Sequence, residues 1–182
     1  MSRHRAARVA AGRLHGLRVA LLATGLLMAP AAALAAQAAA ELRGRAERVV
    51  DGDTLWLVPS DGGRALKLRL QGLDAPELCQ PWGPQARDAL RALVQGRELR
   101  VHVVTRDDYG RLLARVADAQ GRDLGEELVR QGAAWNDGWH RRPGPYAAAE
   151  RAARALGLGL HADPAALTPR EFRHRQGPCV PG

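Results

Sequence analysis

The feature that most constrains the fold is an alternation of leucine with polar residues on both sides of one turn. The strand-like pattern covers residues 45–58, stops at the turn-forming Pro-Ser-Asp-Gly-Gly sequence of residues 59–63, and resumes at residues 66–70. Because successive side chains of a strand point to opposite faces, this pattern predicts a β-hairpin with one apolar face. Arg69 falls on the polar face of the second strand.

Helix-start and helix-stop residues mark three expected helices in the rest of the chain. We expect these helices at residues 84–95, 124–131 and 145–156. Two further strands are expected at residues 99–104 and 111–117, around a turn at residues 107–110. Strands that come first, with helices interleaved later, indicate an α+β fold in which a small barrel or curled sheet has helices on one side.

Residues 1–35 have the composition of a secretory signal peptide. Five arginines precede an apolar run at residues 19–28, and the Ala-Leu-Ala sequence of residues 33–35 has the form of a signal-peptidase site. We therefore expect export, to a periplasmic or secreted location. The alternative is an uncleaved membrane anchor, because residues 19–36 lack charge and are nearly long enough to span a bilayer.

The net charge of the chain depends on whether this leader is removed. The full sequence has 27 basic and 19 acidic residues, a net charge of +8. Loss of the five arginines of residues 1–35, which contain no acidic residue, would leave +3. A mildly basic protein is compatible with a nucleic-acid substrate but does not require one. We expect the remaining chain to consist of a linker at residues 36–44, one folded domain at residues 45–160 and a Pro-rich tail at residues 161–182 that wraps around the surface.

The two cysteines of the chain are Cys79 and Cys179. An exported protein meets an oxidising compartment, which favours a disulfide between them. Such a bridge would tie the segment after Glu77 to the C-terminus, and closing a loop of about 100 residues is worth at most about 4–5 kcal/mol in chain entropy. The alternative is a pair of free thiols or an intermolecular bridge.

Five charged side chains lie in three segments near the expected strand ends. They are Asp53, Arg69, Asp74, Glu77 and Arg111. Carboxylates bind a divalent cation and activate water, while guanidinium groups grip phosphate, so this set could break a phosphodiester bond with one cation. The alternative is that each charge belongs to a solvated face, as most charged residues do.

The sequence Asp-Ala-Pro-Glu at residues 74–77 adds a backbone oxygen to this set. Pro76 favours an extended conformation at Ala75, which would direct the Ala75 carbonyl as a third oxygen toward a cation. Asp53 and Asp74 would supply the other two ligands. Glu77 would lie beyond them, near enough to orient or deprotonate a bound water.

Four motifs occur in a specific order along the chain. They are Val-Val-Asp-Gly-Asp-Thr (49–54), Leu-Arg-Leu followed by Asp-Ala-Pro-Glu (68–77), Asp-Tyr-Gly-Arg (108–111) and Leu-Val-Arg-Gln-Gly (128–132). This ordered set resembles the staphylococcal nuclease (thermonuclease) family, over about residues 45–134, with a looser similarity at residues 146–173.

The resemblance implies a mainly β, α+β fold, namely a five-stranded OB-fold barrel with about three packed helices. It implies a Ca²⁺-dependent phosphodiesterase of the endonuclease type that cleaves DNA and RNA and leaves 3′-phosphate ends. Together with the signal-like residues 1–35, it predicts an exported nuclease. It assigns Asp53, Asp74 and the Ala75 carbonyl to Ca²⁺, Glu77 to the general base, and Arg69 and Arg111 to the phosphate and the transition state. We expect a monomer with no obligate protein partner and, once the leader is cleaved, no stable membrane anchor.

Several positions depart from the best-known member of that family. Ala75 stands in place of a threonine, and this change keeps the backbone carbonyl that would bind the ion. Asp108 stands in place of a lysine, so the substrate pocket has one positive charge fewer. The paired tyrosines that follow Arg-Gln-Gly are also absent. We expect Tyr109 to contact the substrate and Trp135 or Trp139 to stack on bases instead, with burial as the alternative for at least one of the tryptophans.

Two other classes of function are compatible with these motifs. Nuclease-like barrels also serve as catalytically inactive modules that bind nucleic acid or protein. A structural Ca²⁺ protein is the third class, although it would have no use for Arg69 and Arg111. The complete set of five charged residues favours the enzyme.

Overall fold

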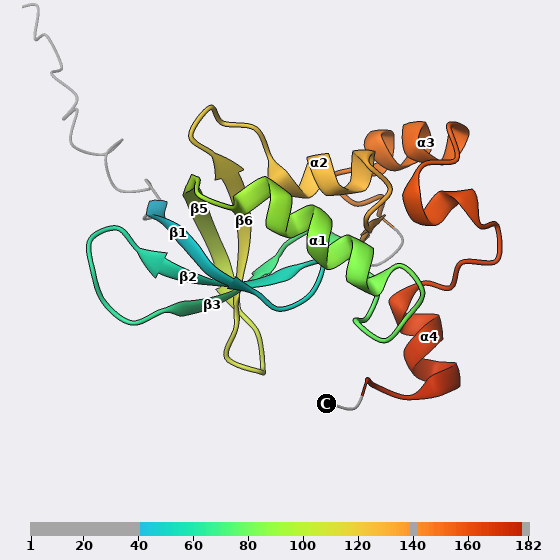
Figure 1. The fold of residues 1–182 in the computed structure, drawn as a ribbon, viewed down its shortest axis with the longest axis horizontal. Helices are drawn as coiled ribbons and strands as arrows, with labels where there is room; N and C mark the ends of the chain where they lie inside the picture. The colour runs from blue at the N-terminus through green and yellow to red at the C-terminus, as the bar shows by residue number, and fades with distance from the viewer. Residues whose placement is uncertain (1–40, 139–141, 180–182) are drawn as a thin grey trace, which may run out of the picture. The chain divides into compact units, whose positions relative to one another are not determined.

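Five strands form a closed barrel in the described part of the chain, residues 41–138 and 142–179 of the computed structural model (Figure 1). The strands pair in the order β1-β2-β3-β6-β5, and β5 returns to β1. Only the β3–β6 pair among these is parallel. The strands are β1 (Glu41–Val49), β2 (Thr54–Pro59), β3 (Leu66–Leu70), β5 (Glu98–Arg106) and β6 (Leu112–Asp118). The predicted α+β barrel is therefore confirmed.

The barrel closes because one face of each strand is apolar. Four leucines of the β2–β3 hairpin, Leu55, Leu57, Leu68 and Leu70, are at most 2% exposed and fill the interior. Arg69 lies on the opposite face of β3, as the alternation predicted, and pairs in register with Thr54. The hairpin thus presents one polar row on the outside of the barrel.

Three helices follow the positions that the sequence predicted. They are α1 (Gly83–Val94), α2 (Leu124–Arg130) and α3 (Ala147–Ala155). α1 and α2 pack against the strands, and α3 packs on α2. Among the described residues, none of the helices has the length and apolar character needed to cross a membrane.

A short antiparallel pair lies beside the barrel. β4 (Leu73–Asp74) pairs with β7 (Trp135–Asn136), so that Asp74 is opposite Trp135. A backbone hydrogen bond of 2.9 Å from the Asp137 nitrogen to the Gly72 oxygen extends this pair. The pairing fixes the backbone of Asp74 directly after the barrel strand that carries Arg69.

The ends of the folded unit differ from the expected boundaries. β1 begins at Glu41, and residues 41–44, expected to be a linker, pair with β5. The expected surface-wrapping tail contains a 3-10 turn, η2 (Gly159–Ala162), and a fourth helix, α4 (Pro169–Gln176). The expected signal peptide, residues 1–35, lies outside the described residues.

The disulfide predicted between Cys79 and Cys179 is present, with 5.7 Å between the two Cα atoms. A second long-range contact supports it, because the Gln80 side-chain nitrogen donates a hydrogen bond of 2.5 Å to the Leu167 carbonyl. Together these contacts fasten the segment that carries α4 to the chain that leads into α1.

Candidate active site

The loop between β1 and β2 places Asp53 in a buried position. The Asp53 side chain is 8% exposed, and its Oδ1 accepts a hydrogen bond of 2.8 Å from the Thr54 hydroxyl. Asp51 supports the loop from within, since its Oδ1 accepts a hydrogen bond of 3.0 Å from the Asp53 nitrogen. A Cβ on Gly52 would lie 2.7 Å from the Cβ atoms of both Ala75 and Ala86, so glycine allows this loop to lie against the Ala75 segment.

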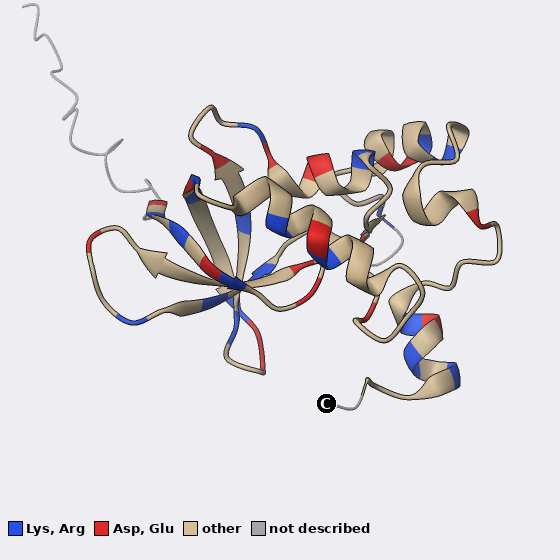
Figure 2. Cartoon of the chain, in the orientation of Figure 1, with Lys and Arg blue, Asp and Glu red and all other residues tan. Residues whose placement is uncertain are grey.

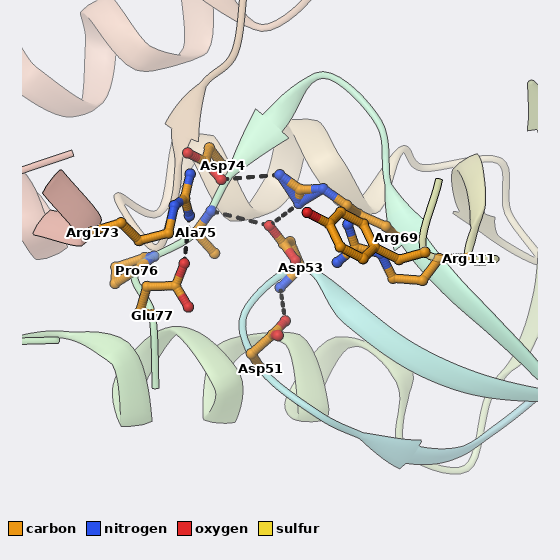
Figure 3. A pocket seen from close by; sticks show the side chains of 10 residues that line it. Asp51, Asp53, Arg69, Asp74, Ala75, Pro76, Glu77, Arg111 and Arg173 are labelled. Carbon is orange, nitrogen blue, oxygen red and sulfur yellow. Dashed lines mark hydrogen bonds and ion pairs between the residues drawn. The ribbon is translucent and has the colours of Figure 1, made fainter. Parts of the chain in front are cut away.

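Arg69 connects the two aspartates that were expected to share a cation (Figure 3). Its Nη1 forms an ion pair with Oδ2 of Asp53, and its Nη2 donates a hydrogen bond of 3.0 Å to Oδ1 of Asp74. The Asp53 Oδ2 also accepts a hydrogen bond of 3.4 Å from the Ala75 nitrogen. One planar guanidinium therefore holds both carboxylates in one place.

Burial makes the negative charge of this cluster costly. The pKa of Asp74 is raised to about 6 by desolvation and by the charge of Asp53. The pKa of Asp51 is raised to about 7, again mainly by desolvation and then by Asp53. Carboxyl groups that are hard to ionise in the protein alone are a suitable environment for an added cation, which would stabilise their charged forms.

A tight turn directs Glu77 into the same pocket. The Gln80 nitrogen donates a hydrogen bond of 2.8 Å to the Glu77 carbonyl, and α1 begins directly afterwards. A Cβ on Gly83 would lie only 2.1 Å from that carbonyl oxygen, so glycine is required at this close approach. The Glu77 carboxylate forms an ion pair with Arg173 of α4 (Figure 3).

Arg111 enters from the start of β6 on the other side of the pocket. Its Nε donates a hydrogen bond of 2.6 Å to Oδ2 of Asp107, which fixes the direction of the guanidinium. The ring of Tyr109 lies 5.4 Å from the Arg111 Cζ, within the range of a cation–π contact, and Tyr109 is 84% exposed. This pair forms the open side of the pocket, where a substrate could approach.

Seven residues expected in the site line one pocket of about 360 Å³. Besides the seven expected residues, its lining includes Asp51, Pro76 and Arg173, giving four carboxylates and three guanidiniums in total. The seven expected residues are Asp53, Arg69, Asp74, Ala75, Glu77, Tyr109 and Arg111. The spatial grouping inferred from three separate segments is thus present.

The tryptophans do not extend this pocket in the described residues. Trp135 is 6% exposed and belongs to β7, so it has too little free surface to stack on a base, contrary to the expectation for a substrate-binding residue. The buried role, which was the alternative, is the one the structure supports. Trp139 lies outside the described residues.

Comparison with known proteins agrees with this geometry. Residues 67–163, just over half of the chain, match the family model described as staphylococcal nuclease homologue. The chain belongs to the staphylococcal nuclease family. An Escherichia coli O157:H7 protein named "Uncharacterized endonuclease" is 34% identical over 137 residues, which cover 75% of this chain and 88% of that protein.

Two further proteins show how widely this similarity extends. A Haemophilus influenzae protein, also named "Uncharacterized endonuclease", is 33% identical over 132 residues, covering 72% of this chain and 73% of its own. A rice protein named "Probable staphylococcal-like nuclease CAN1" is 35% identical over 108 residues, 59% of this chain but only 32% of the longer rice protein. Similar proteins therefore occur in bacteria and in plants.

The donor set fits a cation that keeps open coordination positions. In the described part of the chain, no group of three or more His, Cys, Asp or Glu side chains is arranged so that it could hold a metal ion by itself. The expected set has only two carboxylates, Asp53 and Asp74, with a backbone carbonyl at Ala75. Hard oxygen donors of this number suit Ca²⁺ with water or phosphate oxygens completing its shell.

Of the three lining residues that were not expected in the site, Arg173 comes from the most distant part of the chain. It lies beyond residue 163, where the match to the staphylococcal nuclease family model ends. A signal for it was nevertheless available. The expected disulfide would bring the tail close to Glu77, and Arg173 is the arginine that the bridge carries to the pocket.

Proposed function

We propose that this protein is a Ca²⁺-dependent nuclease that hydrolyses phosphodiester bonds of DNA and RNA and leaves 3′-phosphate ends. The observation that carries the proposal is the Arg69 guanidinium bound to both Asp53 and Asp74 in one pocket with Glu77 and Arg111. A cation site, a base and two phosphate-binding forks are the components that this reaction needs.

Each residue has a distinct role in this proposal. Asp53, Asp74 and the Ala75 carbonyl would hold the cation, which when bound would supply positive charge to the phosphodiester. Glu77 takes a proton from the attacking water through its carboxylate. Arg69 and Arg111 grip the phosphate and neutralise the charge that builds at phosphorus, while the 5′-oxygen leaves.

Arg69 connects the two expected cation ligands with the phosphate in this proposal. Its guanidinium contacts both Asp53 and Asp74, and its planar fork is suited to a phosphate as well. The expected affinity for Ca²⁺ alone is weak, about 10⁻⁴–10⁻³ M, because the protein supplies few ligands.

We also propose that the protein acts after export, in the periplasm or outside the cell. The signal-like composition of residues 1–35 supports this location. The Cys79–Cys179 disulfide supports it as well, since such bridges persist in oxidising compartments. The proposed partner is the nucleic-acid substrate alone, with the protein acting as a monomer.

The direct test uses the chain from residue 36 onward with single-stranded DNA, duplex DNA and RNA of defined sequence. We expect cleavage in millimolar Ca²⁺ and none with a chelator. The new ends should lose a labelled phosphate to a phosphatase that acts on 3′-phosphates. DNA that migrates more slowly in a gel with the protein but is not cleaved would instead identify a binding module. Cleavage that continues in the presence of chelator would exclude the Ca²⁺ requirement.

A further inference from the structure

A basic helix from the end of the chain reaches the proposed active site. α4 contains Arg170, Arg173 and Arg175, and it is visibly rich in basic residues in Figure 2. Of these three arginines, only Arg173 lines the pocket that holds Glu77. Its Nη1 forms an ion pair with Oε1 of Glu77, across 96 residues of sequence.

Two contacts outside the ion pair hold α4 in this position. The Cys79–Cys179 disulfide lies two residues after Glu77 and six residues after Arg173. The Gln80 side chain donates a hydrogen bond to the Leu167 carbonyl, just before the helix. A capping box formed by Thr168 and Glu171 stabilises the start of the helix itself. A covalent bridge and a polar contact therefore place the helix that carries Arg173.

The ion pair itself explains little of the stability of the fold. The side chains of Arg173 and Glu77 are 43% and 28% exposed, and ion pairs this open to water contribute little. What the contact does fix is the direction of the Glu77 carboxylate. A base must lie within hydrogen-bond reach of the water it deprotonates, so this direction matters for rate.

We infer that Arg173 is a positioning residue for the reaction, which holds the Glu77 carboxylate in the orientation needed to activate water. This inference rests on the proposed nuclease function. The charge of Arg173 also lowers the pKa of Asp74, in a pocket that has one more carboxylate than guanidinium groups. The Arg173 guanidinium therefore also moderates the repulsion between Glu77 and the aspartates. The disulfide secures this arrangement by keeping α4 beside the pocket.

Steady-state kinetics of Arg173→Gln, in Ca²⁺ with a defined single-stranded oligonucleotide, test the inference. We expect kcat to fall roughly 10- to 100-fold, the scale of loss seen when partners that orient site residues are removed, with KM changed less than threefold. Arg173→Lys should restore part of kcat because it keeps the charge. Arg170→Gln is the matched control, since it removes the same charge from an exposed position of α4 outside the pocket, and we expect wild-type kinetics.

The disulfide provides a second, independent measurement. The Cys79→Ser, Cys179→Ser double variant should lose kcat to a similar extent in the wild-type background. In the Arg173→Gln background, the same double change should cost little further kcat, because both changes remove the same orientation of Glu77. If the double change lowers kcat by the same factor in both backgrounds, the proposed link between the disulfide and Arg173 is contradicted.

The outcomes separate this inference from the proposed function. If the wild type cleaves and Arg173→Gln keeps its kcat, or gains rate, the positioning role is wrong and the nuclease remains. A rise in KM at unchanged kcat would make Arg173 a substrate-binding residue and would also overturn the inference. A wild type without any cleavage would overturn the proposed function and this inference together. The melting temperature of each variant checks that the variant is folded under the conditions of the kinetic assay.

Discussion

Arg69 is the residue on which the geometry of the site most depends. Its two terminal nitrogens reach Asp53 and Asp74, and it is placed there by the strand alternation that also buries Leu68 and Leu70. The sequence pattern could therefore assign both its strand and its face. The sequence could also identify Asp53 and Asp74 as site residues. It could not predict that both carboxylates contact Arg69, because the relative position of their two loops depends on tertiary packing.

Replacement of Arg69 by lysine should be severely damaging. An ammonium group cannot contact two carboxylates and a phosphate with the planar geometry of a guanidinium. We expect kcat/KM to fall by about a thousandfold, corresponding to roughly 3–4 kcal/mol of transition-state stabilisation. Arg64→Lys, in the exposed β2–β3 turn, is the control with the same chemical change and should keep the wild-type value. A loss under tenfold for Arg69→Lys would contradict the phosphate-binding role.

The individual elements show where sequence patterns were sufficient. The later strands and the helices bounded by proline or glycine were predicted within a few residues, because local chemistry determines them. The single strand expected at residues 45–58 was wrong, since the structure has two strands there, β1 and β2, with the loop that carries Asp53 between them. α4 was missed, since its only large apolar residue is Phe172 and two prolines lie nearby. Its capping box, Thr-Pro-Arg-Glu, was the one local signal that could have revealed it.

The turn η2 gives a prediction about pH. Burial, followed by the nearby charge of Arg154, lowers the pKa of His161, so the folded state favours the neutral imidazole. Above the unfolded value of about 6.5, neither state is protonated and the free energy of unfolding is unaffected. As pH falls below this value, the unfolded chain binds the proton first, and the folded protein loses stability.

The His161→Gln variant isolates this effect, because other titrating groups such as Asp51 and Asp74 are common to both proteins. Denaturant unfolding at pH 8 and pH 5 should show a larger decrease in the free energy of unfolding for the wild type than for the variant. Identical decreases in the two proteins would show that His161 does not contribute.

At the scale of the whole molecule, the covalent bridge determines how the tail meets the barrel. The cysteine count and the expected export predicted this disulfide, but not that it carries a helix with an active-site arginine. Tertiary contacts also overrode the expectation for Trp135, which lies in the β4–β7 pair and packs inward. Which of several aromatic residues is buried depends on tertiary packing, and the spacing of residues in the sequence does not determine it.

Removal of the Cys79–Cys179 disulfide should destabilise the folded protein, but the barrel should still form. Constraining a loop of this length in the unfolded chain typically stabilises by about 2–4 kcal/mol. The Cys79→Ser, Cys179→Ser double variant should therefore unfold at lower denaturant concentration, with a far-ultraviolet circular dichroism spectrum close to that of the wild type. An unchanged unfolding midpoint would show that the tail contributes no closure entropy.

In the proposed mechanism, Glu77 activates water for phosphodiester cleavage in a pocket that holds Ca²⁺. The measurement that tests this role is the single-turnover cleavage rate of Glu77→Gln against the wild type at saturating Ca²⁺, with Ca²⁺ binding measured by calorimetry on both proteins. We expect the variant to bind the cation but to cleave roughly 10²- to 10⁴-fold more slowly. A variant that binds Ca²⁺ and cleaves at the wild-type rate would show that Glu77 is not the base.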